Sequence, residues 1–110
     1  MQHIAKVDLK GEASSVTDDW KNWVLAQVND HVVRISVMTR DFHWHRHTNS
    51  DEVLLALEGS LIVDFEDQSL TVDAGEFVRV PRNTLHRTRP ASNRVVTLSF
   101  EHKDTEVTGG

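Results

Sequence analysis

The feature that most constrains the fold is a series of short strand-like runs separated by turn residues. Residues 32–38 and 61–65 are rich in β-branched side chains, which favour strands. Val96, Leu98 and Phe100 alternate with polar or smaller residues, and this period of two is typical of a half-buried strand. Turn-forming residues separate the runs, at 29–30, 58–60, 66–68, 74–75 and 81–84. The pattern predicts an all-β fold, either a small antiparallel barrel or a closed sandwich.

The chain of 110 residues is expected to form one domain over residues 1–110, because domains most often contain about 100–150 residues. Only residues 15–23 are considered for a helical turn. The tail 103–110 ends in Thr-Gly-Gly and is expected to be frayed.

The composition excludes several classes of chemistry and of partner. The chain has no cysteine and no tyrosine, so disulfides, thiolate ligands, catalytic thiols and catalytic phenols are excluded. A net charge of −5 argues against nucleic acid and anionic membranes as partners. The longest purely apolar stretch, residues 53–57, is far too short to span a membrane, and the N-terminus lacks an apolar run of signal-peptide length. We therefore expect a cytoplasmic protein.

Three of the seven histidines lie within five residues, at His43, His45 and His47. Side chains alternate between the two faces of a strand, so all three imidazoles point the same way. Two imidazoles on neighbouring same-face positions can bind one metal ion, and the carboxylate of Glu52 follows closely. His86 follows a proline turn on a later predicted strand. Alternation alone does not distinguish the pair 43/45 from the pair 45/47.

The spacing of these residues resembles the two sequence motifs of the cupin superfamily. Four residues separate His47 from Glu52, six more lead to Gly59, and a gap of fifteen residues precedes the second motif. That motif reads Gly75, five residues, Pro81, four residues, His86. The chain departs from the family pattern at three positions, with Thr39 and Asn83 in place of glycines and Pro90 in place of an asparagine. Asparagine is the next best residue to glycine at a left-handed turn position.

The resemblance implies a double-stranded β-helix and one divalent transition metal bound by His45, His47, Glu52 and His86. Iron, manganese, nickel, zinc and copper are the candidates for that metal. The count to Glu52 selects the pair 45/47, which makes His43 a residue at the rim of the site or behind a ligand, or else a proton shuttle. Glu52 and His43 are the candidates for a catalytic role. Asp51 is expected to be a solvated or capping carboxylate.

Alternation along the strands also predicts residues of a pocket. If Glu52 and His86 point inward, the inward neighbours are Leu54, Ala56, Thr84 and Thr88. Residues 77–100 contain five arginines and no acidic residue, namely Arg79, Arg82, Arg87, Arg89 and Arg94. These arginines either hold an anionic substrate or, as we favour, pair with acids such as Asp64 on other strands.

The three tryptophans suggest a homodimer interface or, equally, a clamp that fixes the N-terminal segment over one end of the barrel. Trp44 faces away from the ligand histidines. For function, we expect a metalloenzyme acting on a small oxygenated or carboxylated molecule, with dioxygenase chemistry ahead of isomerase or lyase chemistry. The alternatives are a cupin that binds or senses a small ligand without turnover, and a purely structural metal.

Overall fold

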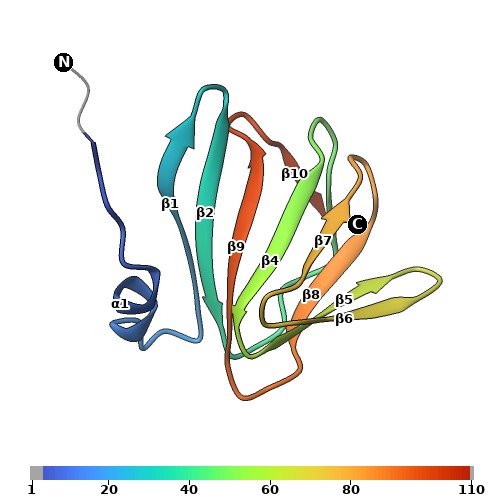
Figure 1. Ribbon diagram of the computed structural model, residues 1–110. Coiled ribbons are helices and arrows are strands. Elements are labelled where there is room, and N and C mark those ends of the chain that lie inside the picture. Colours follow the sequence, from blue (N-terminus) through green and yellow to red (C-terminus); the bar gives the residue numbers. More distant parts are fainter. Residues whose placement is uncertain (1–3, 110) are drawn as a thin grey trace.

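The structure is a computed structural model that describes residues 4–109, and it consists of two five-stranded antiparallel sheets facing each other (Figure 1). The expected all-β fold is confirmed, and the architecture is that of the double-stranded β-helix. One sheet has the strand order β1-β2-β9-β4-β7 and the other β10-β3-β8-β5-β6. The elements are α1 (Leu9–Ser14), β1 (Trp20–Val28), β2 (His31–Met38), β3 (His45–His47), β4 (Glu52–Glu58), β5 (Ser60–Phe65), β6 (Ser69–Asp73), β7 (Phe77–Val80), β8 (His86–Pro90), β9 (Val95–His102) and β10 (Val107–Gly109).

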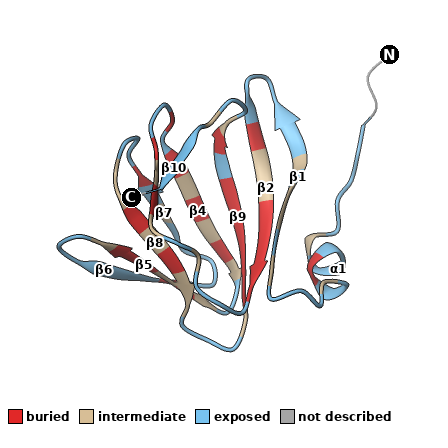
Figure 2. Cartoon of the chain, turned by 180° about the vertical axis from the view of Figure 1, so that it is seen from behind, coloured by how far each residue is buried: buried red, intermediate tan, exposed pale blue. Residues whose placement is uncertain are grey.

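The main core lies between the two sheets. It is built from the inward-facing apolar residues of both, Met38, Leu54, Ala56, Leu61, Val63, Val72, Val80 and Val95. The alternate residues of β2 and β9 form a second cluster on the outer face of the first sheet, where the buried Ala13 of α1 joins Ile35, Val37, Val96 and Leu98. Figure 2 shows buried residues concentrated in the central strands, whereas the outer strands β1 and β6 are largely exposed.

The helix lies outside the segment considered for it. Residues 9–14 form α1, and the strand β1 begins at Trp20, inside the range 15–23. The reason is tertiary: β1 pairs with β2 along its length, from Trp20 opposite Met38 to Val28 opposite His31. This pairing buries one side of Trp23 in the outer cluster, and packing of that kind overrides local preference. None of the helices within residues 4–109 is both long and apolar enough to cross a membrane.

The C-terminal tail also differs from its expected frayed state. Val107, Thr108 and Gly109 pair with His47, Arg46 and His45, so β10 covers the free edge of β3. The segment that leads to it is held by hydrogen bonds to Asn49, which donates to the Asp104 carbonyl and accepts from the Glu106 amide, both at 2.9 Å. Three residues carry too short a pattern to predict a strand, and only the neighbouring strand stabilises them. Gly110 lies outside the described residues.

Candidate metal centre

Three strands from both sheets bring together the four residues that the sequence motifs single out. His45 and His47 lie on β3, and His86 on the adjacent β8 is the register partner of His45. Glu52 begins β4 in the opposite sheet and reaches across to the histidines. The imidazole centroids of His45 and His86 are 4.4 Å apart, and those of His45 and His47 are 5.1 Å apart. The cluster therefore connects the two sheets at one position.

The geometry of this cluster fits a metal ion. One potential ligand atom from each residue lies within 4.8 Å of the others. Glu52 Oε1 is 3.3 Å from His47 Nε2 and 3.5 Å from His86 Nε2. Adjacent ligands that each lie about 2.1 Å from a metal are separated by about 3.0–3.4 Å. The four residues are buried, with exposed fractions of 4% for His45, 6% for His47, 8% for Glu52 and 0% for His86.

Backbone carbonyls orient two of the imidazoles. His45 Nδ1 donates to the carbonyl of His43, and His86 Nδ1 donates to the carbonyl of Thr84, both at 2.8 Å. A carbonyl only accepts, so the proton of each ring is on Nδ1, and Nε2 keeps its lone pair for a metal. Among the described residues, His86 Nε2 and both ring nitrogens of His47 are buried without a hydrogen-bond partner. Buried nitrogens of this kind are costly in a protein interior unless a ligand occupies the site.

The electrostatics of the cluster favour a cation. Burial lowers the pKa of His45 to about 4, so this imidazole is neutral at pH 7. Burial alone would raise the pKa of Glu52, but the nearby imidazoles of His47 and His86 outweigh it and lower that pKa to about 2. Burial likewise opposes a charge on His47, yet the neighbouring Glu52 carboxylate raises the pKa of this imidazole. Before any metal binds, an ionised carboxylate therefore lies among imidazoles, where it attracts either a proton or a metal ion.

The turn before β8, in the second motif, makes a backbone hydrogen bond to β3, in the first motif. Asn83 has a φ of 61°, in the left-handed region, which agrees with the expectation that asparagine replaces glycine there. Its backbone amide donates to the carbonyl of His47 at 2.6 Å. Gly59, at the end of the first motif, has a φ of 71°, and a Cβ there would lie 2.2 Å from the carbonyl oxygen of Arg94. Both motif turns thus depend on backbone conformations that few residues adopt.

A cavity of about 250 Å³ extends from the cluster into the space between the sheets. Two of the four expected pocket residues, Leu54 and Thr88, line it. Ala56 instead packs in the core, and Thr84 contributes the carbonyl that orients His86. The remaining lining includes Met38, Leu61 and the stacked pair Trp20 and Phe42, whose ring centroids are 5.2 Å apart.

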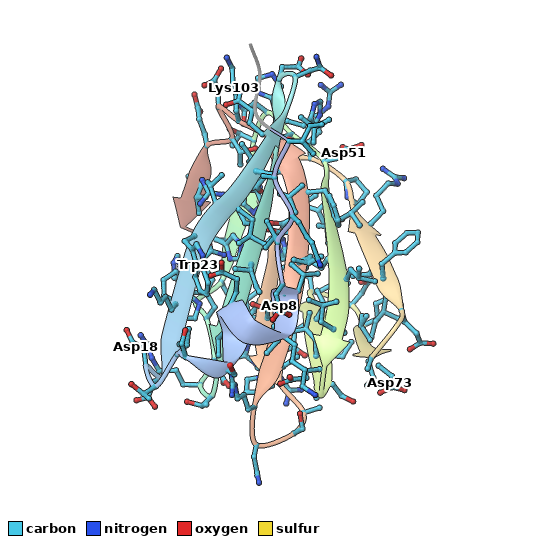
Figure 3. The ribbon with its side chains drawn as sticks, turned by 60° about the vertical axis from the view of Figure 1, so that its left-hand side comes forward. Asp8, Asp18, Trp23, Asp51, Asp73 and Lys103 are labelled. Carbon is cyan, nitrogen blue, oxygen red and sulfur yellow. The ribbon has the colours of Figure 1, made fainter. Side chains whose placement is uncertain are left out.

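Two candidate residues adjacent to the ligands in sequence lie outside the cluster. The side chain of His43 is exposed, and its contribution to the cluster is the carbonyl that accepts from His45. Asp51 lies at the surface of the molecule (Figure 3), where its carboxylate accepts hydrogen bonds from Arg79 at 3.1 Å and from the Arg82 amide at 2.8 Å. The Arg82 amide and the charge of Arg79 lower the pKa of Asp51. Asp51 is therefore a capping carboxylate, as expected.

The arginines that we assigned to ion pairs are largely paired. Arg87 and Arg89 both donate to the buried carboxylate of Asp64, at distances of 2.8–3.2 Å. Arg94 donates to the carbonyl of Ala13 in α1. Arg87 also lies over the ring of Trp44, the residue before β3, with 5.2 Å between the guanidinium carbon and the ring centroid.

A pair of ionisable residues on the opposite cavity wall, Arg34 and Glu101, lies outside both sequence motifs. Glu101 on β9 and Arg34 on β2 line the cavity, with 3.1 Å between Arg34 Nε and Glu101 Oε1. Burial, together with the nearby carboxylate of Glu52, raises the pKa of Glu101 to about 7. Thr97, Ser99 and Glu101 share one face of β9, so alternation groups them correctly, but it does not tell which face points inward.

Comparisons with known proteins agree with this architecture. The family model described as a cupin domain matches residues 31–100. The chain is 41% identical over 95 residues to the uncharacterized protein YdbB of Bacillus subtilis (strain 168), covering 86% of this chain and 83% of YdbB. The crystal structure of a cupin-2 domain containing protein from Shewanella frigidimarina is similar with a TM-score of 0.82, 27% identity, and coverage of 88% of this chain and 94% of that one. For protein NMB1881 from Neisseria meningitidis, the TM-score is 0.79 and the identity 29%, with coverage of 90% and 100%. The chain belongs to the cupin domain family.

Proposed function

We propose that this chain binds one divalent transition metal through His45, His47, Glu52 and His86. The observation that carries the proposal is the convergence of buried donors: the Nε2 atoms of His45 and His86 are the free nitrogens of their rings, and both rings lie beside Glu52. Three imidazoles and one carboxylate suit iron, manganese, nickel, zinc and copper. Four protein ligands leave one or two positions of an octahedron for water, oxygen or a substrate.

The proposed activity is metal-dependent chemistry on a small oxygenated or carboxylated molecule. The cavity of about 250 Å³ is slightly smaller than the range of about 300–1,000 Å³ that is usual for ligand pockets, which favours a small substrate. Met38, Leu54 and Leu61 would exclude water around such a molecule, and Thr88 and Ser99 would offer it hydroxyl groups. The bound metal would supply a position for oxygen or a chelating substrate, or would polarise a carbonyl.

Oxygenation is the reaction class that we place first. Isomerases and lyases need groups that hold and move protons near the substrate. Among the described residues that line the cavity, Arg34 and Glu101 are the ionisable side chains outside the four proposed ligands, and they are paired with each other. A redox-active metal would carry most of an oxygenation, so this reaction class demands least from the side chains. The same scarcity favours the second candidate, a cupin that binds a small ligand without turnover.

Metal analysis of protein purified without a metal-chelating tag tests the first step. We expect close to one transition metal ion per chain, or one added ion after treatment with a chelator. The substrate-facing positions are then tested with the manganese(II) form by measuring the relaxation rate of water protons. Bound water should enhance this rate, and small carboxylates and diols that chelate the metal should reduce the enhancement.

Each outcome separates the candidates. A chain that takes up none of the five metals refutes the proposed site. A bound manganese ion without water enhancement means that protein closes the coordination sphere, which refutes the enzyme and leaves a structural metal. Oxygen consumption by the iron(II) form with a carboxylate or diol that displaces water would support the oxygenase. Tight binding of such a molecule without consumption or conversion would favour the binding protein.

A further inference from the structure

The three histidines of the cluster differ in how their second ring nitrogen is held. His45 and His86 each donate from Nδ1 to a backbone carbonyl at 2.8 Å. His47 Nδ1 is buried and has no hydrogen-bond partner within the described part of the chain. Histidines that bind metals nearly always donate from the other nitrogen to a carboxylate, a carbonyl or water, because that bond fixes the tautomer and the ring orientation. One of the three proposed ligands therefore lacks a support that the other two have.

A buried carboxylate lies beside the unsupported nitrogen. Glu101 Oε2 is 3.8 Å from His47 Nδ1, and this oxygen is also buried without a hydrogen-bond partner among the described residues. The other oxygen, Oε1, is engaged by Arg34 Nε at 3.1 Å. Arg34 in turn donates from Nη1 to Asn22 Oδ1 at 3.2 Å. Glu101 is thus anchored through neighbouring strands β9, β2 and β1, and its free oxygen is the one nearer His47.

We propose that Glu101 is the residue that positions His47, by accepting a hydrogen bond from His47 Nδ1 when Nε2 binds the metal. A metal on Nε2 places the ring proton on Nδ1, and this proton then needs an acceptor. Closing the gap from 3.8 Å to the usual charge-assisted distance of about 2.8 Å requires the two side chains to approach each other by about 1 Å. The inference rests on the proposed metal site. It adds two residues of the opposite sheet to that site: Arg34 holds Glu101, and Glu101 positions His47.

The proposal is tested with the zinc form, which is diamagnetic, by measuring the zinc dissociation constant and the nitrogen-15 NMR signals of the histidine rings. We compare the unchanged chain with Glu101→Ala and Glu101→Gln, and use Glu58→Ala, at an exposed position, as the matched control. Glu101→Ala should weaken zinc binding by about 10- to 100-fold, the range typical of lost outer partners of a ligand. Glu101→Gln keeps an acceptor oxygen and should restore part of this loss.

The NMR signals distinguish positioning from a general structural effect. In the unchanged chain the Nδ1 proton of His47 should be protected from exchange, and in Glu101→Ala this protection should disappear while the Nδ1 signals of His45 and His86 keep their positions. If the unchanged chain does not bind zinc, the proposed metal site itself fails. If it binds zinc and Glu101→Ala keeps both the affinity and the His47 signal, only the role of Glu101 is refuted. Lost affinity with an unchanged His47 signal would mean that Glu101 affects zinc binding by a route other than His47, which also overturns the positioning role.

Discussion

Replacing His86 by alanine should abolish most of the stabilisation that a metal gives to the fold. His86 is fully buried, comes from a different strand than the other three ligands, and faces Glu52 across 3.5 Å. The space left by its ring is enclosed, so the replacement ligand would be a water molecule, which binds the metal less tightly than an imidazole. We therefore expect metal binding to weaken by more than about tenfold, or about 1.4 kcal/mol.

Thermal unfolding with and without metal measures this loss. A metal at about 100 times its dissociation constant stabilises a folded chain by about 2.7 kcal/mol, whereas tenfold weaker binding leaves about 1.4 and hundredfold weaker binding about 0.4 kcal/mol. At about 4 °C per kcal/mol, the unchanged chain should gain about 11 °C, and His86→Ala should gain about 6 °C or less at the same metal concentration. Each gain is taken from the protein's own metal-free midpoint, so that packing lost with the ring cancels.

His43→Ala is the matched control, because it removes an imidazole from the same segment but from an exposed side chain that contributes its carbonyl to the cluster. It should keep the full metal-induced gain. An equal gain for His86→Ala and the unchanged chain would refute the assignment of His86 as a ligand. Loss of the gain in His43→Ala would instead move the ligand pair to His43 and His45, and would contradict the motif spacing.

Three further predictions concern pH, the cavity and the ion-pair cluster. Because the pKa of His47 is raised, its imidazole carries a proton at pH values below that pKa and must lose it before a metal can bind. In that pH range, the metal affinity measured by calorimetry should fall by about tenfold for each pH unit. A metal affinity that does not change down to about pH 5 would contradict this prediction. Trp20→Ala removes one wall of the cavity but no proposed ligand, so metal content should stay constant while carboxylates too bulky for the unchanged chain gain affinity. Hydrogen bonds from Arg89, then Ser69 and Arg87, lower the pKa of Asp64, so its stabilising effect is present above the unfolded-state pKa of about 3.9 and is lost as the pH falls below it. Asp64→Asn should lower the unfolding midpoint at pH 7 and flatten the acid side of the stability profile; parallel profiles for the two proteins would refute this role.

The sequence predicts the fold, and it predicts which four residues form the buried cluster, because strand alternation and motif spacing are encoded locally. Alternation places His45 and His47 on one face of β3, and the spacing to Glu52 chooses between the two possible histidine pairs. The structure brings these residues together with His86, although their role as ligands stays a prediction until metal binding is measured. Turns can also be predicted from a few neighbouring residues: Asn83 replaces a glycine of the motif, and its backbone has the left-handed conformation expected there.

What the sequence did not predict depends on contacts between distant segments. Glu101 belongs to the cavity because β9 pairs with β2 on one side and β4 on the other, and neither register can be derived from alternation. Trp20 is on a strand rather than a helix for the same reason, since β2 and Phe42 provide its packing. The strand at 107–109 has too few residues for any periodicity to be visible.

The position of β10 determines the order in which the strands around the proposed binding site can assemble. β3 carries two of the proposed ligands and is synthesised in the first half of the chain, but its two neighbours in the sheet, β8 and β10, both come from the second half. Until residues 107–109 exist, the outer edge of β3 has unpaired amides and carbonyls and resembles any exposed strand edge, which is prone to pair with other chains. Residues 107–109 therefore cover the outer edge of the strand that carries His45 and His47, and they can do so only after β3, β4 and β8 have all been made.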